Sequence, residues 1–325
     1  MPSLTYLDAI SRGLWEEMER DSSVFLLGED IGAYGGAFKA TKGFLDRFGG
    51  DRVIDTPISE GAILGAAIGA AVAGMRPVAE MQFADFVTCG FNQLVVNASR
   101  IHYRWSLPVP MVVRLPNGGY IHGGPYHSSS AEAWFFHVPG LKIVAPSTPY
   151  DAKGLIASAI RDENPVLFFE YKYLYRRVKG DVPDGPFQVP IGKGEVKRRG
   201  NDCAIITYGS TVHSSLEAAE QLSREKGVEC RVVDLRTLAP LDLDLVLQTA
   251  RETGKVLIVH EDNLTGGIGG EIAAVIADQA FEFLDAPIKR VASLDCPVPF
   301  APSLEESVLP DKGKILEVLR ELCRY

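Results

Sequence analysis

The sequence predicts an α/β fold in which a doubly wound parallel sheet is followed by a second α/β domain. Short apolar runs alternate with segments of helical periodicity along the chain, a pattern typical of parallel strands joined by crossover helices. The 325 residues are 46% hydrophobic and 23% charged, as in an ordinary globular protein. A central stretch rich in Pro, Gly and charge divides the chain, so two domains are expected.

The first domain is expected to span residues 1–185. Residues 3–20 carry apolar side chains at helical spacing, and Thr5 and Asp8 are spaced as a capping box at the start of this helix. Six strands are predicted after it, at 24–30, 51–56, 76–83, 109–116, 141–147 and 164–171. Helices are predicted between the strands, at 61–75, 87–104, 131–137 and 149–162.

The second domain is expected to span residues 203–325, after a linker at 186–202 that carries one short strand near 189–196. Its strands are predicted at 203–210, 229–237, 255–262 and 289–295. Its helices are predicted at 212–226, 242–252, 270–284 and near 312–323. This second set repeats the strand-then-helix style of the first domain, without a sequence repeat between them.

Charge and cysteine usage exclude several classes of function. The formal charge of −9 argues against nucleic-acid binding, because a net negative charge does not attract a polyanion. The five cysteines form no CxxC pair, which favours a reducing compartment. A predicted helix follows Met1 almost at once, without signal-peptide features, so a cytoplasmic location is expected. The apolar run from Gly61 to Met75 is too short to span a membrane and predicts a buried helix whose small residues admit close neighbours.

Chemistry-bearing side chains follow the predicted strands of the first domain. Ligands of open parallel sheets bind at the carboxyl ends of the strands, so these side chains are expected on one rim. The candidates are Glu29, Ser59, Glu60, Gln82, Phe83, Phe86 and, in a Gly-rich loop, His127. Motifs for nucleotide phosphates, zinc proteases and serine hydrolases are absent.

Each candidate also has a structural explanation. Glu60 follows Thr56, Pro57 and Ser59, so it either complements the dipole of a helix or is a partly desolvated carboxyl with a raised pKa, suited to donate a proton. His127 is either an exposed loop residue or a catalytic group. Phe83 and Phe86 are either core residues or a platform for a ligand.

Several segments resemble the beta subunit of the 2-oxo acid dehydrogenases, the thiamine-diphosphate-dependent decarboxylase component of multienzyme complexes. The segments include "RVIDTPISEGAILGAAIGAA", "RPVAEMQFADF", "YHSSSAEAWFFHVPGLKIVAPSTPYDAKGLI" and "DLRTLAPLD", and the likeness covers essentially the whole chain. The segments "AEMQFADF" and "YHSSSAEA" are most similar to the branched-chain type. Pyruvate and acetoin dehydrogenase beta subunits remain alternatives.

The resemblance implies a pyrimidine-binding domain followed by a transketolase-type C-terminal domain. It also implies an alpha subunit that holds the diphosphate and magnesium, in a heterotetramer of two alpha and two beta subunits that docks on a lipoyl acyltransferase core. The chain has "GDV" at 180–182 but lacks the Gly-Asp-Gly signature of diphosphate binding. We therefore expect no productive cofactor binding by this chain alone.

The resemblance also assigns roles to single residues. Glu60 matches the glutamate that hydrogen-bonds the aminopyrimidine ring of thiamine diphosphate and promotes its ionisation. Phe86 matches a ring that packs on the pyrimidine, where branched-chain members usually have Tyr, and Phe83 lies beside it. His127 matches a histidine that faces the reacting centre. Further cofactor contacts are implied for Glu29, Ile58, Ser59 and Gln82.

A structural potassium ion is a further implication of the resemblance. Its ligands would be an Asp-x-Asn pair together with backbone carbonyls, which are hard oxygen donors. The matching residues are Met111, Val112, Ala159, Ile160, Asp162 and Asn164. Two readings compete with a catalytic beta subunit: a non-catalytic interaction subunit that keeps the fold, and a stand-alone enzyme similar to transketolase.

Overall fold

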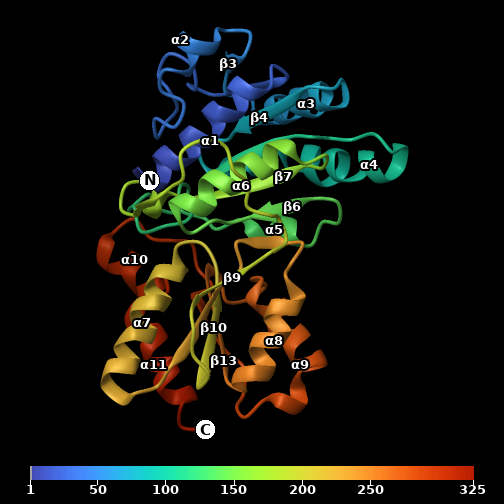
Figure 1. Cartoon of the computed structure of the whole chain (residues 1–325). Coiled ribbons are helices and arrows are strands. Elements are labelled where there is room, and N and C mark those ends of the chain that lie inside the picture. The colour runs from blue at the N-terminus through green and yellow to red at the C-terminus, as the bar shows by residue number, and fades with distance from the viewer. Residues whose placement is uncertain (1) are drawn as a thin grey trace. The chain divides into compact units, whose positions relative to one another are not determined.

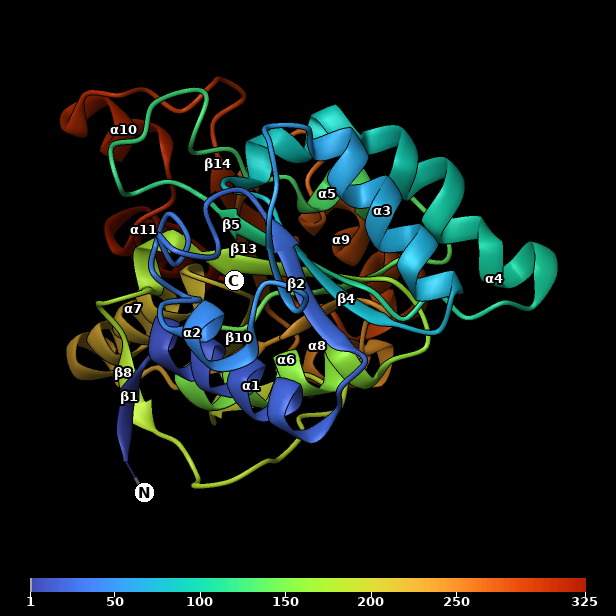
Figure 2. The ribbon, with the colours of Figure 1, turned by 90° about the horizontal axis from the view of Figure 1, so that it is seen from above.

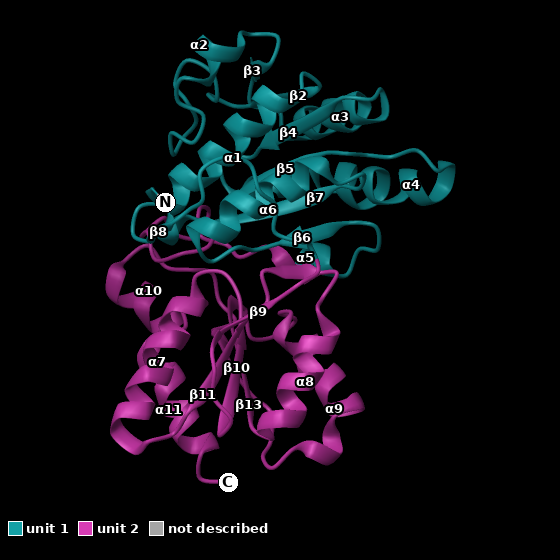
Figure 3. Ribbon diagram, viewed as in Figure 1, with its two compact units in different colours: residues 1–117, 134–191 teal, residues 118–133, 192–325 magenta. Residues whose placement is uncertain are grey.

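The computed structural model describes residues 2–325, and these form two compact units (Figure 3). Unit 1 comprises residues 1–117 and 134–191, and unit 2 comprises residues 118–133 and 192–325. The loop at 118–133 therefore belongs with unit 2, although it directly follows a strand of unit 1. The chain enters the long segment of unit 2 at residue 192, inside the linker predicted from the sequence.

Unit 1 is built on six parallel strands, in the order β6-β7-β5-β4-β2-β3. All six strands predicted from the sequence are confirmed: β2 (Val24–Gly28), β3 (Val53–Asp55), β4 (Arg76–Glu80), β5 (Val112–Asn117), β6 (Lys142–Val144) and β7 (Val166–Tyr171). After β3 the chain crosses back past β2 to form β4, so the direction of winding reverses between β2 and β4. Ligands of doubly wound sheets bind at such a switch point.

Helices cover both faces of this sheet, as Figure 2 shows. One face carries α1 (Tyr6–Arg20) and α6 (Pro149–Arg161), which pack against each other. The opposite face carries α3 (Glu60–Val72) and α4 (Ser99–Trp105). The capping box is confirmed, since the Thr5 hydroxyl accepts a hydrogen bond from the Asp8 N–H at 3.1 Å. The shorter elements of unit 1 are α2 (Phe44–Phe48), α5 (Glu132–Phe136) and η3 (Lys172–Leu174).

The helix predicted at 87–104 is confirmed as a helical segment, but only part of it is a regular α-helix. The segment consists of a 3₁₀ helix, η1 (Ala84–Gly90), a π-helix, η2 (Gln93–Ala98), and then α4. Gly90 explains the irregular start, because a Cβ at this position would lie 2.3 Å from Leu64 Cδ1 of α3. The close approach of η1 to α3 thus depends on a residue without a side chain. A two-stranded antiparallel pair, β1 (Ser3–Thr5) with β8 (Lys179–Asp181), was not predicted.

Unit 2 contains a five-stranded sheet in the order β14-β13-β10-β11-β9. Figure 1 shows β9, β10 and β13 of this sheet with helices on either side. Four strands are parallel and β9 is antiparallel: β9 (Glu195–Arg198), β10 (Cys203–Thr207), β11 (Cys230–Asp234), β13 (Val256–Asn263) and β14 (Lys289–Ser293). The helices α7 (Thr211–Lys226) and α11 (Lys312–Leu322) pack together, as do α8 (Leu243–Thr253) and α9 (Gly269–Gln279). The remaining elements are β12 (Thr237–Ala239), η4 (Phe281–Phe283) and α10 (Pro302–Val308).

Within residues 2–325, none of the helices combines the length and the apolar character that a bilayer crossing requires.

Candidate functional site

Two carboxylates face each other at the switch point of the unit 1 sheet. Glu29 directly follows β2, and Glu60 is the first residue of α3. The Thr56 N–H donates to the Gly28 carbonyl oxygen at 2.9 Å, which ties the end of β2 to the segment leading into α3. The Glu29 side chain is buried, with 6% of its surface exposed, while Glu60 is half-buried. The structure therefore confirms that these two predicted residues belong to one rim.

The environment of Glu29 is unfavourable for a charged carboxylate. Burial raises the pKa of Glu29, and the neighbouring charges of Glu60 and Asp30 raise it further. A hydrogen bond from the Ser59 backbone N–H opposes this shift. The Oε1 atom of Glu29 is buried and has no hydrogen-bond partner among the described residues. A buried acceptor without a donor is costly unless a ligand supplies one, so this atom is a candidate binding position.

Aromatic rings form a wall beside these carboxylates. Phe83 and Phe86 meet edge to face, with ring centroids 5.8 Å apart, and Phe38 meets Phe83 in the same way at 5.5 Å. Gln82 precedes them and donates to Asp30 Oδ2 at 3.3 Å. The sequence analysis did not select Phe38, although the Gly-rich segment at 32–43 was a signal of a loop that lies close to a ligand.

The expectation of a fully buried α3 is wrong for this chain by itself. Ala62, Ala66, Gly69 and Val72 are exposed along one side of the helix. Ile58, which precedes the helix, is 83% exposed. The physical reason is that α3 is apolar on every side, while a single sheet can cover only one side of it. An apolar helix of this kind needs a second surface to bury the rest.

His127 lies in the loop that belongs to unit 2. This loop is attached to its own unit, because the Gly119 N–H donates to Glu261 Oε1 at 2.5 Å and the Tyr120 hydroxyl donates to the Pro310 carbonyl oxygen. His127 is half-buried, and its N–H donates to the Gly124 carbonyl oxygen at 3.2 Å. The placement of His127 on the same rim as Glu60 stays a prediction.

A second acidic group at this edge was missed by sequence reasoning. Arg114 of β5 lies between Glu80 of β4 and Glu170 of β7, and all three are buried. The guanidinium donates to both carboxylate oxygens of Glu170, at 2.6 and 2.9 Å, and also to Glu80. The Tyr175 hydroxyl adds a hydrogen bond to Glu170 at 2.7 Å. Burial raises the pKa of Glu80, against the lowering effect of the Arg114 charge.

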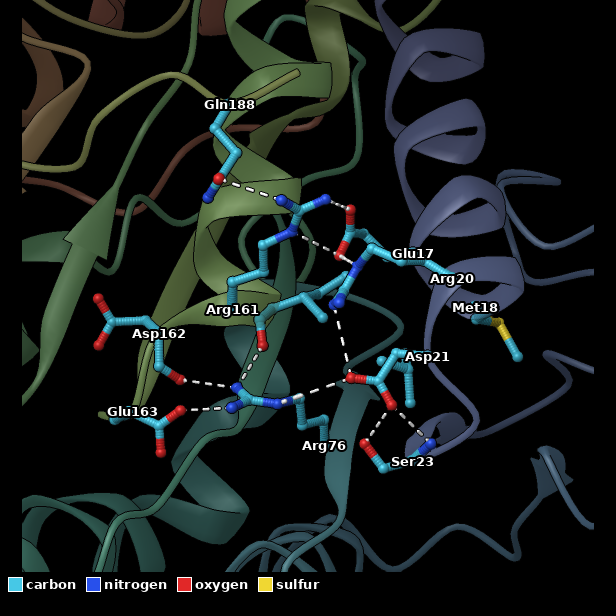
Figure 4. Close-up of polar contacts among 12 residues, drawn as sticks. Glu17, Met18, Arg20, Asp21, Ser23, Arg76, Arg161, Asp162, Glu163 and Gln188 are labelled. Atoms are coloured by element: carbon cyan, nitrogen blue, oxygen red, sulfur yellow. Dashed lines mark hydrogen bonds and ion pairs between the residues drawn. The ribbon is translucent and has the colours of Figure 1, made fainter. Parts of the chain in front are cut away.

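The oxygens expected to bind potassium are already used by protein donors. The Arg76 guanidinium donates to the carbonyl oxygens of Ile160, at 2.9 Å, and of Asp162, at 3.3 Å (Figure 4). The Asp162 carboxylate pairs with Lys142 and accepts two hydrogen bonds from Asn164, at 2.9 and 3.0 Å. Two protein cations thus lie against oxygens that the resemblance assigns to potassium.

The remaining predicted ligands show the same pattern. The Met111 carbonyl oxygen accepts from the Val166 N–H at 2.9 Å, and the Ala159 carbonyl oxygen accepts from the Asp162 N–H at 3.3 Å. Val112 lies in β5, between two neighbouring strands. Arg76 and Lys142 thus contact several of the predicted ligands, and potassium binding by this set stays a prediction. Among residues 2–325 there is also no group of three or more His, Cys, Asp or Glu side chains arranged for a metal.

Comparisons with known proteins place the chain in a family. Residues 2–178 match the family described as transketolase, pyrimidine binding domain, and residues 192–315 match transketolase, C-terminal domain. The 2-oxoisovalerate dehydrogenase subunit beta of Bacillus subtilis (strain 168) is 52% identical over the full length of both chains. The pyruvate dehydrogenase E1 component subunit beta of the same organism is 42% identical, again over the full length of both chains.

A further relative and a solved structure are also similar to this chain. The beta subunit of an acetoin:2,6-dichlorophenolindophenol oxidoreductase of Bacillus subtilis (strain 168) is 42% identical, over 97% of this chain and 96% of its own. A solved structure titled split gene transketolase, inactive beta4 tetramer, has a TM-score of 0.81 at 22% identity, covers 99% of this chain and 98% of its own, and supports the fold. The chain belongs to the family of 2-oxo acid dehydrogenase beta subunits, which combine a transketolase pyrimidine-binding domain with a transketolase C-terminal domain.

Proposed function

We propose that this chain is the beta subunit of a branched-chain 2-oxo acid dehydrogenase, which decarboxylates its substrate oxidatively and passes the acyl group to a lipoyl arm. The substrate class is supported by the 52% identity to the 2-oxoisovalerate dehydrogenase subunit of Bacillus subtilis (strain 168), against 40–43% for the subunits named for pyruvate and acetoin. The observation that carries the site is the buried Oε1 atom of Glu29, which lacks a partner in the described chain and belongs to a carboxylate beside Glu60.

The residues around this atom fit the aminopyrimidine ring of thiamine diphosphate. When bound, this cofactor supplies the nucleophilic carbon and the electron sink for decarboxylation. Glu60 holds the proton exchanged with the ring nitrogen, and Glu29 offers its free oxygen to a donor on the ligand. The Ser59 N–H fixes the Glu29 carboxylate in place. Ile58, Gln82 and Phe86 complete the contacts with the cofactor.

On the substrate side we assign Phe83 and Phe86 of unit 1, and the resemblance assigns His127 of unit 2 to the same role. The two rings present apolar edges suited to a branched acyl chain, and they exclude water from the reacting carbon. His127 transfers a proton at the reacting group or orients the incoming lipoyl arm. No role is given to potassium, because Arg76 and Lys142 already neutralise its expected ligands.

An alpha subunit completes this site. The exposed apolar side of α3 is continuous with a groove on unit 1, and the groove is lined by Gly65, Ile68, Val96, Ile101, Tyr103 and Trp105. The alpha subunit covers this surface and brings the diphosphate and magnesium ligands that this chain lacks. We propose a cytoplasmic heterotetramer of two alpha and two beta subunits. Its C-terminal domains join the beta subunits and dock on the acyltransferase core.

The test is a reconstituted assay with three substrates. The chain is co-expressed with an alpha subunit encoded beside it, and reduction of an artificial electron acceptor is followed with thiamine diphosphate and magnesium. We expect kcat/KM for 3-methyl-2-oxobutanoate to exceed that for pyruvate and for acetoin at least tenfold. Preference for pyruvate or acetoin would be consistent with the proposed mechanism but would contradict the proposed substrate class. Absence of turnover with all three, despite cofactor binding, would favour a non-catalytic subunit.

Isothermal titration of the chain without a partner separates the remaining alternative. We expect no stoichiometric binding of thiamine diphosphate by the chain alone. Tight binding at one site per chain would instead support a stand-alone enzyme similar to transketolase.

A further inference from the structure

Three cysteines meet in unit 2. Cys203 and Cys230 are the first residues of β10 and β11, and they are direct partners in this parallel pair. Neighbouring strands lie about 4.8 Å apart, a separation within the range of Cα distances that disulfides span. The two Sγ atoms are 2.8 Å apart, and both side chains are fully buried. The pair is therefore already placed for an S–S bond.

Cys323 connects this buried pair to the surface. It follows α11, is half-buried, and packs against the apolar core cluster that contains Cys203 and Cys230. Cys323 also lies close enough to Cys203 for the two thiols to interact. The three sulfur atoms thus form a continuous path from the solvent to the interior.

The surrounding charges place the thiolate on the accessible cysteine. The hydrogen bond with Cys203 lowers the pKa of Cys323 to about 7, with help from Lys255 and Lys226 and against burial and Asp202. Hydrogen bonds with Cys230 and Cys323, and burial, raise the pKa of Cys203. Cys323 is therefore the cysteine of this cluster that loses its proton most readily and supplies the reactive thiolate, while Cys203 keeps its proton.

We propose that Cys323, Cys203 and Cys230 form a peroxide-sensitive disulfide relay. The Cys323 thiolate attacks a peroxide ROOH, so an S–O bond forms, the O–O bond breaks, and the leaving alkoxide takes up a proton as ROH. The Cys203 sulfur then attacks the sulfenic acid, and its proton leaves with the hydroxide as water. The product is a disulfide between Cys203 and Cys323.

A thiol–disulfide exchange completes the relay. The Cys230 sulfur attacks Cys203, the S–S bond to Cys323 breaks, and Cys323 leaves as a thiolate while the Cys230 proton passes to solvent. Exchange is faster when the leaving thiol has the lower pKa, and Cys323 meets this condition. Overall, two buried thiols and one peroxide give one disulfide, one ROH and one water, and the surface thiolate is restored.

The test uses the full chain, hydrogen peroxide and peptide mass spectrometry after thiol blocking. The background carries Cys89→Ser and Cys296→Ser, because these two cysteines are exposed and lie outside the cluster. We expect a disulfide between Cys203 and Cys230, formed at a rate that rises with pH around a midpoint of about 7. Cys323→Ser is expected to slow this step at least tenfold.

Two further variants separate the steps. Cys230→Ala is expected to trap the disulfide between Cys203 and Cys323, and Cys203→Ala to leave Cys323 as sulfenic or sulfinic acid without any disulfide. Circular dichroism shows which variants are folded. If a variant of the buried Cys203 or Cys230 does not fold, the measurement on Cys323→Ser alone tests the relay. Formation of the disulfide at an unchanged rate in Cys323→Ser would overturn the relay. Reduced Cys203, Cys230 and Cys323 after complete oxidation of Cys89 and Cys296 in the native chain would also overturn it.

Discussion

Two groups of carboxylates lie at the carboxyl edge of the same sheet, and they differ in whether an arginine pairs with them. Glu80 and Glu170 are buried around Arg114, which donates hydrogen bonds to both. Glu29 and Glu60 lie one strand away. Among residues 2–325 no ion pair to either carboxylate is seen, and one buried oxygen of Glu29 has no hydrogen-bond partner. The paired residues Gly28 and Glu80 in β2 and β4 show how close the two groups are.

The difference separates a structural role from a binding role. A buried carboxylate that is satisfied by an arginine holds strands together, and removing its partner leaves an uncompensated charge. A carboxylate pair that lacks a cation reduces the stability of the free chain and is retained where a ligand supplies the missing donor. We therefore assign a structural role to Arg114 and propose a ligand-binding role for Glu29 and Glu60. Four predictions test this division.

The largest effect is expected from Arg114→Met. It leaves Glu80 and Glu170 buried without their cation, which costs about 3–5 kcal/mol of folding free energy. Urea unfolding followed by tryptophan fluorescence measures the loss in unit 1, because Trp15, Trp105 and Trp134 all lie in that unit.

The matched control for this variant is Arg47→Met, which removes an arginine whose ion pair with Glu19 is exposed on both sides. It is expected to cost no more than about 1 kcal/mol. Equal losses of folding free energy in the two variants would contradict the structural role assigned to the buried Arg114.

The next effect is expected from Glu60→Gln in the reconstituted enzyme. Loss of a proton-transfer group lowers kcat by about 10²–10⁴-fold, while the free energy of unfolding of the chain changes by less than about 0.5 kcal/mol. The control is Glu271→Gln, because Glu271 is an exposed glutamate in the first turn of α9. An equal loss of activity in both variants would contradict the assignment of Glu60.

A smaller effect concerns the pH dependence of stability at Glu29. Its pKa is raised in the folded chain, so the folded state binds more protons than the unfolded state above the ordinary glutamate pKa. Stability contributed by the protonated form is present below the unfolded pKa and is lost as pH rises through the folded pKa. Glu29→Gln is expected to flatten this part of the stability profile in urea unfolding at pH 4–8. An unchanged slope would mean that another group carries it.

The smallest effect is expected on exchange of potassium chloride for tetramethylammonium chloride. Because Arg76 and Lys142 neutralise the expected ligands, the free energy of unfolding should change by less than about 0.5 kcal/mol. Arg76→Met frees the carbonyl oxygens of Ile160 and Asp162, so only this variant is expected to be stabilised by potassium. A potassium requirement in the native chain would instead place Asp162 among metal-binding groups.

The sequence allowed good prediction of the strands, because buried parallel strands are read from local apolar runs. It also allowed prediction that Glu29 and Glu60 share a rim, since the rule on carboxyl ends of strands needs only their order. It gave a weak signal for Arg114, an arginine inside the apolar run "MVVRLP". The pairing of Arg114 with two glutamates from other strands depends on which strands become neighbours, and local patterns do not show this.

Other features depended on tertiary packing alone. The assignment of loop 118–133 to unit 2 results from contacts with residues far along the chain, such as Gly119 with Glu261. The close approach of Gly90 to α3, in the irregular part of the helix predicted at 87–104, is likewise a tertiary contact. The meeting of Cys203, Cys230 and Cys323 combines two strands with the end of a helix, although their spacing in the sequence matches no known motif.

By itself the sequence determined the α/β class, the positions of the strands and the residues that follow them, because backbone periodicity and helix-start signals are local properties. The tertiary structure decided which charges are neutralised and which are left open. Arg114 pairs with Glu80 and Glu170, whereas no cation of the described chain pairs with Glu29 or Glu60. The reason is that electrostatic interactions and desolvation depend on distance in space and on burial, and both arise only when the strands are assembled into the sheet.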